Sequence, residues 1–163
     1  MIKGKRVLWY LSALMVVFLS SCLSTEKMEV EENLKIQTYV SEHGNVPYVL
    51  KSSGIYYADI TAGTGIKPVA HDTAYIYYNA MYLSEIVFGT NIGTKDTLIA
   101  PVNEGFLIAG FDEAITYMNE GGKAMAVVPS YLGYGNNSYY IPAYTPIVFD
   151  IRLVRVKRGP GAR

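Results

Sequence analysis

Chemically reactive side chains are scarce in this sequence of 163 residues, which holds one cysteine, Cys22, and two histidines, His43 and His71. The histidines lie far apart in the sequence and no second cysteine can join them as a ligand, so no metal site is expected. A single cysteine also excludes an intramolecular disulfide. The sequence has no Gly-x-Ser-x-Gly nucleophile elbow either, so His71 and Asp72 are interpreted as surface polar residues rather than as parts of a hydrolase triad.

Charge is sparse as well. The chain carries 14 Lys and Arg against 14 Asp and Glu, a formal net charge of zero, and 50% of its residues are hydrophobic. Zero net charge argues against a nucleic-acid-binding protein, and the apolar composition argues against intrinsic disorder. Gly63-Thr64-Gly65 lacks the later residues of a dinucleotide loop or a P-loop, so it is interpreted as a turn. The sequence therefore indicates one packed domain without a cofactor.

The first 21 residues look like a bacterial signal peptide. Met1 to Arg6 carries three positive charges, and Val7 to Leu19 is a run of thirteen uncharged residues. This run is shorter than the ~20 residues of a transmembrane helix. Leu19-Ser20-Ser21-Cys22 resembles a lipobox, at which the peptidase cuts before the cysteine and the thiol carries diacylglycerol. We expect a lipoprotein of the cell envelope anchored through Cys22, with the outer membrane favoured. The alternative is an ordinary signal peptide in which Cys22 has no role.

The rest of the chain is predicted to hold a tether, a helix and one domain. Residues 22–52 contain the tether and a helix over Glu29 to His43, where apolar residues recur at helical spacing and Gly44 follows as a C-cap. Residues 53–158 form the domain and residues 159–163 a basic tail. The whole basic cluster from Arg155 to Arg163 is expected to be a solvated, frayed end.

Short β-rich runs separated by turn residues predict an antiparallel α+β domain. One short helix is expected from Phe111 to Met118, where apolar residues recur at i, i+3, i+4 and i+7. Acidic Asp112 and Glu113 fit the start of that helix. The expected strands cover Gly54–Thr61, Thr73–Leu83 with a continuation over Ile86–Phe88, Lys123–Val128 and Ile147–Lys157, and the expected loops cover Gly89–Asp96 and Pro129–Pro146.

Aromatic residues gather in three clusters, within residues 75–88, 106–111 and 131–144. A sheet core explains such clusters as readily as a pocket does. The motifs around them, however, resemble those of the FKBP-type peptidyl-prolyl cis-trans isomerases over about residues 54–157. The matching motifs are Leu107-Ile108-Ala109-Gly110-Phe111, Ala114-Ile115, Met118 to Gly121, Val128-Pro129, Leu132 to Gly135, Ile141-Pro142 and Ile147 to Leu153.

This resemblance implies an FKBP-like twisted antiparallel sheet wrapped around one short α-helix, preceded here by an N-terminal helical extension. It implies a monomeric peptidyl-prolyl isomerase that assists the folding of envelope proteins and binds proline-containing polypeptides in an apolar pocket. The Ile108 N–H and the Tyr134 hydroxyl would donate hydrogen bonds to substrate carbonyls, and the loop with Tyr139, Tyr140 and Tyr144 would cover the pocket. The implied catalytic residues are Tyr78, Phe88, Ile108, Phe111, Tyr134 and Phe149, and the implied substrate-binding residues are Leu98, Leu107 and Ile141.

Two alternatives to an isomerase stay open, the first because of a departure from the family pattern and the second because an aromatic pocket also suits a small apolar ligand. The family motif Phe-Asp-Ser-Ser is Phe88-Gly89-Thr90-Asn91 here, so the motif's acid is replaced by Gly89. A non-catalytic FKBP-like lipoprotein that binds chains or partners is the first alternative, and a carrier of a small apolar ligand is the second. Separately, Thr73 and Thr97 lie in Asp-Thr-Ala and Asp-Thr-Leu triplets that resemble a bacterial O-glycosylation pattern.

Overall fold

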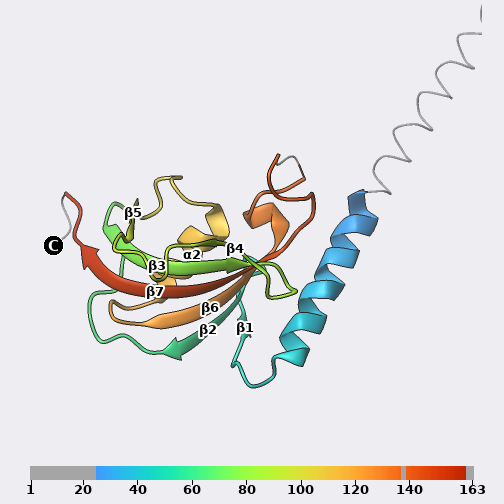
Figure 1. Cartoon of the computed structure of the whole chain (residues 1–163), viewed down its shortest axis with the longest axis horizontal. Coiled ribbons are helices and arrows are strands. Elements are labelled where there is room, and N and C mark those ends of the chain that lie inside the picture. The colour runs from blue at the N-terminus through green and yellow to red at the C-terminus, as the bar shows by residue number, and fades with distance from the viewer. Residues whose placement is uncertain (1–24, 137–138, 161–163) are drawn as a thin grey trace, which may run out of the picture.

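A seven-stranded antiparallel sheet curves around one short helix, and a second helix lies beside one end of the sheet (Figure 1). This computed structural model describes residues 25–136 and 139–160, so the predicted signal peptide and Cys22 lie outside the described residues. The architecture confirms the predicted α+β fold. Its elements are the N-terminal helix (residues 25–42), β1 (Val49–Leu50), β2 (Tyr56–Thr61), β3 (Thr73–Met81), β4 (Val87–Thr90), β5 (Leu98–Pro101), α2 (Ala109–Tyr117), β6 (Lys123–Val128), the 3-10 turn η1 (Ser130–Leu132) and β7 (Ile147–Lys157).

The strand order places β7 in the interior of the sheet. The order is β1-β2-β6-β7-β3-β4, and β5 forms a further pair with β3. Ile147, Phe149 and Ile151 of β7 are buried on the face toward α2, as the alternation of its residues predicts. Val148 is buried too, on the opposite face. The first residues of β7 are therefore covered on both sides, while its later residues alternate between buried and exposed.

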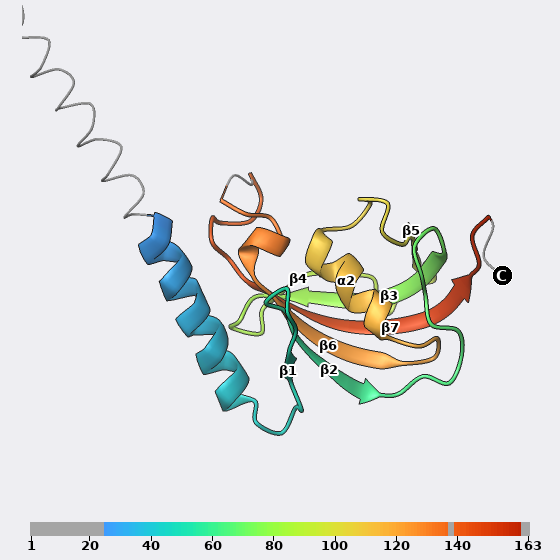
Figure 2. The same ribbon diagram turned by 180° about the vertical axis from the view of Figure 1, so that it is seen from behind.

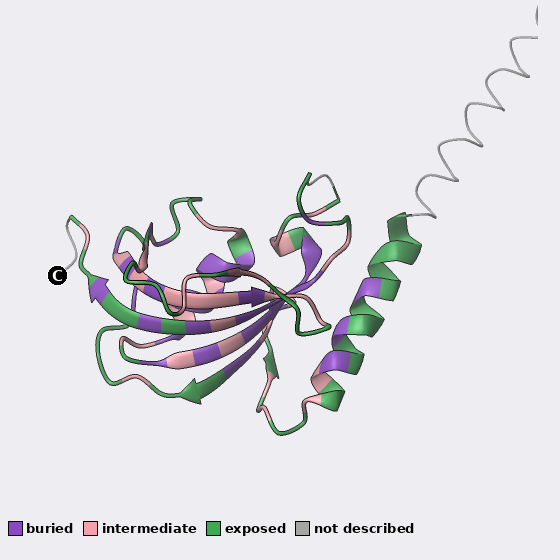
Figure 3. Ribbon diagram, in the orientation of Figure 1, coloured by how far each residue is buried: buried purple, intermediate pink, exposed green. Residues whose placement is uncertain are grey.

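The N-terminal helix covers one end of the second face of the sheet (Figure 2). Ile36 and Tyr39 of this helix pack against Val127 of β6 and Val148 of β7. Figure 3 shows the buried residues of the helix as one stripe toward the domain. Within residues 25–136 and 139–160, no helix has both the length and the apolar character needed to cross a bilayer. The helix is therefore part of the folded domain's packing, as expected for an extension docked beside it.

Two local predictions are wrong between β3 and α2. Gly89 and Thr90 were expected to start a loop, but they belong to β4 and pair with Ala80 and Asn79 of β3. The sequence analysis also assigns no strand to residues 98–101, which form β5 along the first half of β3. Both segments bring residues to the same edge of the sheet, where the cavity described below opens.

Asp72 is not the surface residue that the sequence predicts. Its side chain is fully buried and accepts hydrogen bonds from the Val69 N–H and the Gly159 N–H, each at 3.0 Å. The Arg158 guanidinium lies 2.6 Å from the same carboxylate. Burial raises the pKa of Asp72, but the hydrogen bonds and the positive charge outweigh burial, so the pKa lies below its ordinary value.

The same contacts show that the basic end of the chain is not frayed as far as Gly159. The strand β7 runs to Lys157 and stays paired with Thr73 of β3. Arg158 and Gly159 then bind Asp72, at the start of β3. The prediction of a frayed end is therefore wrong for residues 155–159, whereas the side chains of Arg155, Lys157 and Arg158 are exposed to solvent, as expected.

Candidate active site

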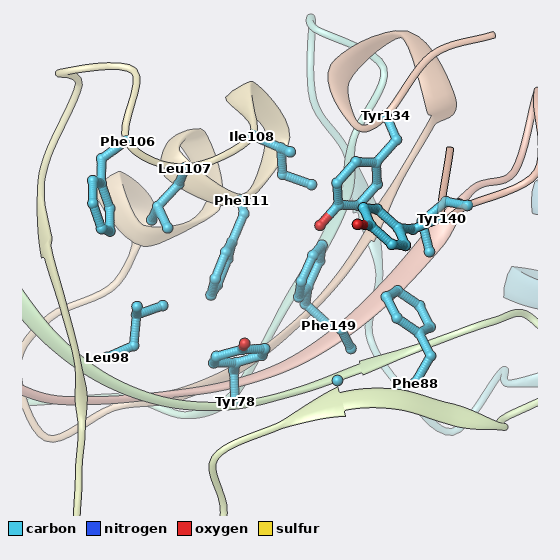
Figure 4. Close-up of a pocket in the computed structure, with 13 residues that line it drawn as sticks. Tyr78, Phe88, Leu98, Phe106, Leu107, Ile108, Phe111, Tyr134, Tyr140 and Phe149 are labelled. Carbon is cyan, nitrogen blue, oxygen red and sulfur yellow. The ribbon is translucent and has the colours of Figure 1, made fainter. Parts of the chain in front are cut away.

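A cavity of about 570 Å³ opens between α2, the sheet edge and the loop that follows η1 (Figure 4). The nine residues that the sequence predicts for a prolyl pocket all line this one cavity, although they come from six parts of the chain: β3, β4, β5, the start of α2, the loop after η1, and β7. Their roles in binding and catalysis stay predictions. The lining residues are Tyr78, Ala80, Phe88, Gly89, Leu98, Phe106, Leu107, Ile108, Phe111, Tyr134, Tyr140, Ile141 and Phe149.

Two stacked phenylalanines form the floor of the cavity. The rings of Phe111 and Phe149 lie parallel with centroids 4.4 Å apart, and each side chain is almost fully buried. Phe111 sits in the first turn of α2 and Phe149 on β7, so the helix and the central strand meet at this pair. The Tyr78 ring from β3 lies 5.5 Å from Phe111. The floor is therefore rigid, apolar and shared by three elements.

Strands β4 and β5 supply the walls on the sheet side. Phe88 of β4 packs on Tyr82, with centroids 4.7 Å apart, and Leu98 of β5 faces the cavity from the other side (Figure 4). Asn91 fixes this edge, because its side chain accepts from the Tyr78 N–H at 2.8 Å and donates to the Ile76 carbonyl at 2.9 Å. The Asn91 side chain, directly after β4, therefore bonds the β3 backbone as a neighbouring strand would, and it keeps this wall of the cavity against β3.

The opposite rim carries two tyrosine hydroxyls, whereas Tyr78 supplies one from the sheet side. Figure 4 shows the Tyr134 and Tyr140 side chains on one side of the cavity, above Phe149 and Phe88. Ile108, the N-cap residue of α2, lies on the same rim as Leu107. Amides at the start of a helix have no acceptor within the helix, so this position suits a bond to a ligand carbonyl. None of the described lining residues carries a charge, so the site offers apolar surface and a few hydrogen-bond donors.

The glycine that replaces the family's acid lies in the cavity wall. A Cβ atom added to Gly89 would lie 3.6 Å from the Ala80 Cβ and 4.0 Å from Tyr78 Cε2, which are ordinary contact distances. The backbone at Gly89 is not in the left-handed region, so other residues can adopt it. Nothing in the packing therefore requires glycine at this position.

Sequence reasoning misjudged two details of the rim. It assigned no role to Phe106, which is 60% exposed and lines the cavity. Phe106 directly precedes the Leu107 motif but does not belong to it, so the motif alone gives no signal for its place on the rim. Of the three loop tyrosines expected to cover the pocket, Tyr140 lines the cavity, whereas Tyr139 is 94% exposed and Tyr144 lines a separate small hollow beside Asn136.

Asp112, near the floor, was expected only to suit the start of a helix, but its carboxylate also binds the loop before α2. It is buried, and both of its carboxylate oxygens accept from the Asn103 N–H, at 3.0 and 2.9 Å. Burial raises the pKa of Asp112, against the opposite effect of the Asn103 N–H. Asn103 has a φ of 58°, so the carboxylate holds the strained loop that leads to Phe106.

Comparison with known proteins agrees with this geometry. The pattern of the FKBP-type peptidyl-prolyl cis-trans isomerase family matches residues 64–154. The chain is 28% identical over 135 residues to FKBP-type peptidyl-prolyl cis-trans isomerase FkpA of Aeromonas hydrophila, which covers 82% of this chain and 50% of the relative. It is 30% identical over 136 residues to Outer membrane protein MIP of Legionella longbeachae, which covers 82% of this chain and 58% of the relative.

A solved structure extends the likeness to the N-terminal helix. The crystal structure of FkpA from Escherichia coli superposes with a TM-score of 0.72 at 25% identity, covering 96% of this chain and 74% of that one. This chain spans only about half the length of the Aeromonas relative. The family pattern nevertheless covers more than half of this chain and all of its cavity floor. The chain therefore belongs to the FKBP-type peptidyl-prolyl cis-trans isomerase family.

Proposed function

We propose that this protein is a peptidyl-prolyl cis-trans isomerase that assists the folding of proteins in the bacterial cell envelope. The observation that carries the proposal is the cavity floored by Phe111 and Phe149, into which the predicted site residues converge without a charged group. Family membership supports the reaction type. The substrate is an X-Pro segment of a polypeptide, with the prolyl ring seated on the two phenylalanines.

The reaction needs a shape rather than a nucleophile. Rotation about a peptide bond crosses a barrier of ~18–20 kcal/mol, and X-Pro bonds exchange in tens to hundreds of seconds. In the transition state the amide is twisted, its resonance is lost and its charge separation is reduced. A dry apolar cavity therefore favours the twisted amide over the planar one. Favouring it by ~5 kcal/mol would speed exchange by about four powers of ten.

Two donors on the rim would hold the substrate while its bond turns. The Ile108 N–H and the Tyr134 hydroxyl lie on the rim opposite the sheet, and each would donate to a substrate carbonyl. Donors of this kind fix the chain on either side of the rotating bond. They also keep the prolyl ring on the floor during the rotation.

The test measures kcat/KM for the isomerisation of a proline-containing peptide by the wild type, by Tyr134→Phe and by Tyr139→Phe. Tyr134→Phe removes the hydroxyl but keeps the ring, and it should lower kcat/KM about three- to tenfold, the effect of one hydrogen bond of about 1 kcal/mol. Tyr139→Phe is the matched control, because Tyr139 is on the same loop, 94% exposed and outside the cavity lining. A wild-type rate equal to the uncatalysed rate at micromolar protein would overturn the proposal.

Gly89 supports a second candidate function, in which the pocket binds proline-containing chains without turning them over. The family's acid is absent from the cavity wall at this position. Peptide titration distinguishes the two functions. Saturable binding with isomerisation at background would establish the binding function and exclude the catalytic one.

The envelope location is also a proposal. Its support is the lipobox ending in Cys22, together with the resemblance to a relative that is named an outer membrane protein. Acyl chains on Cys22 would hold the domain at a membrane, since each buried CH₂ contributes about 0.8 kcal/mol. Only the short tether up to the N-terminal helix would then separate the membrane from the folded domain.

A further inference from the structure

A carboxylate is buried where the N-terminal helix meets the domain, outside the lining of the cavity. Glu32 is only 4% exposed, and a charged side chain is rarely buried without strong partners. Both of its oxygens accept from one residue: the Ser130 N–H donates to Oε1 at 2.5 Å and the Ser130 hydroxyl to Oε2 at 2.6 Å. Ser130 is also 4% exposed, so water has little access to these donors.

The Glu32 carboxylate takes the place of a missing N-cap acceptor for η1. Ser130 is the first residue of η1, and the first amides of a helix have no acceptor within it. The N-cap residue is Pro129, which has no side-chain acceptor and makes no cap hydrogen bond. The carboxylate that satisfies the Ser130 amide therefore comes from a helix 98 residues earlier in the chain.

Ser130 in turn fixes the backbone on both sides of Tyr134. The Ser130 carbonyl accepts from the Gly133 N–H and from the Gly135 N–H, each at 2.8 Å. These glycines are the two neighbours of Tyr134, whose side chain lies on the rim of the cavity. A continuous series of hydrogen bonds thus joins the N-terminal helix to the rim through one serine.

We propose that Glu32 is a positioning residue for the prolyl pocket, which sets the place of the Tyr134 hydroxyl through Ser130. The inference rests on the proposed isomerase function for its effect on rate. If Glu32 positions Tyr134, the N-terminal helix contributes to catalysis and does not only separate the domain from its anchor. Loss of the carboxylate loosens the loop without unfolding it, because Leu132 still packs against the main core.

The experiment compares Glu32→Gln with Glu31→Gln in the purified protein. Both changes replace a carboxylate by its isosteric amide on the same helix, but Glu31 is half-exposed and pairs with Lys35 on the surface. Glu32→Gln should raise the amide hydrogen exchange of Gly133 and Gly135 about tenfold and lower kcat/KM about tenfold. Glu31→Gln should leave both unchanged.

Combination with Tyr134→Phe tests whether the effect passes through the tyrosine. If Glu32 acts by placing the hydroxyl, Glu32→Gln causes no further loss of kcat/KM in a Tyr134→Phe background. An equal loss in both backgrounds, or unchanged exchange at Gly133 and Gly135, would overturn the proposal. A wild type without catalysis would refute the proposed function instead, and the hydrogen-exchange comparison would still decide the coupling.

Discussion

Phe111 and Phe149 come from the helix and from the central strand, and they meet face to face below the cavity. Such aromatic pairs contribute about 0.5–1.5 kcal/mol beyond the area that they bury. Truncation of either ring would open a hole in the core and cost about 3–5 kcal/mol of stability. The proposed seat of the prolyl ring and the folding core consist of the same two side chains. Activity is therefore better tested at the rim, where Tyr134→Phe removes one oxygen without leaving a cavity in the core.

At Gly89 we predict a gain of function. Gly89→Asp places a carboxylate in the cavity wall with only ordinary contacts to Ala80 and Tyr78, and it restores the acid of the family motif. The substituted protein should show kcat/KM raised about threefold, since the carboxylate adds about one polar contact to the pocket. Gly89→Asn is the control, because it has the same shape without charge. An equal gain for both variants would mean that polarity or space, and not the charge, is the missing property.

The pocket residues were predictable because they belong to family motifs with a fixed spacing in the sequence. Leu107 to Phe111 and Tyr134 are recognisable in the printed sequence, and the fold brings both segments to the cavity. Phe106 was not predictable, because its place on the rim depends on the loop held by Asp112. The buried role of Glu32 was equally hidden, since its partner lies 98 residues away.

At the scale of elements, the periodic segments were predictable and the short ones were not. The strand β7 has eleven residues of alternating character, and α2 shows helical spacing throughout. The strand β5 has four residues and ends in Pro101, which cannot donate to a sheet and counts against a strand assignment. Its hydrogen bonds come from β3, and no local pattern indicates that pairing.

The contact between the start of β3 and the end of β7 also gives a prediction. Asp72→Asn should lower the free energy of unfolding by about 1–3 kcal/mol, because it weakens a buried acceptor for the Gly159 N–H and removes the charge that pairs with Arg158. Thermal and denaturant unfolding of the wild type, of Asp72→Asn and of Asp96→Asn measure the difference, with Asp96 as the control because it is an exposed acid in the loop before β5.

The pH dependence of this effect follows from the lowered pKa of Asp72. A carboxyl group whose pKa is lower in the folded state stabilises the fold above its unfolded pKa. That stability is lost as the pH falls through the folded pKa. The difference between the wild type and Asp72→Asn should therefore be complete above the ordinary pKa value of 3.8, shrink as the pH falls below 3.8, and disappear only below the lower pKa of the folded state. A difference that stays constant down to strongly acidic pH would contradict the assignment.

At the scale of the whole molecule, the anchor and the oligomeric state stay predictions. Mass spectrometry of the wild type should show acyl groups on a chain that begins at Cys22, because the thiol is the predicted site of acylation. Cys22→Ser should lack these groups and keep the first 21 residues, because cleavage depends on the same cysteine. Ser24→Ala is the matched control, two residues farther along the predicted tether, and should be acylated like the wild type. A wild type without acyl groups would contradict the lipoprotein prediction, and sedimentation velocity of residues 22–163 tests the predicted monomer.

The place of β7 has a consequence for how the protein can be made. This strand lies between β6 and β3 in the sheet but follows every other strand in the sequence. During synthesis, the two halves of the sheet therefore stay unjoined until the ribosome has delivered β7, and Phe149 arrives with it. A precursor of this topology cannot close its active site early. Such late closure suits the export that we propose for this chain, because a polypeptide that has not yet folded can still cross a membrane.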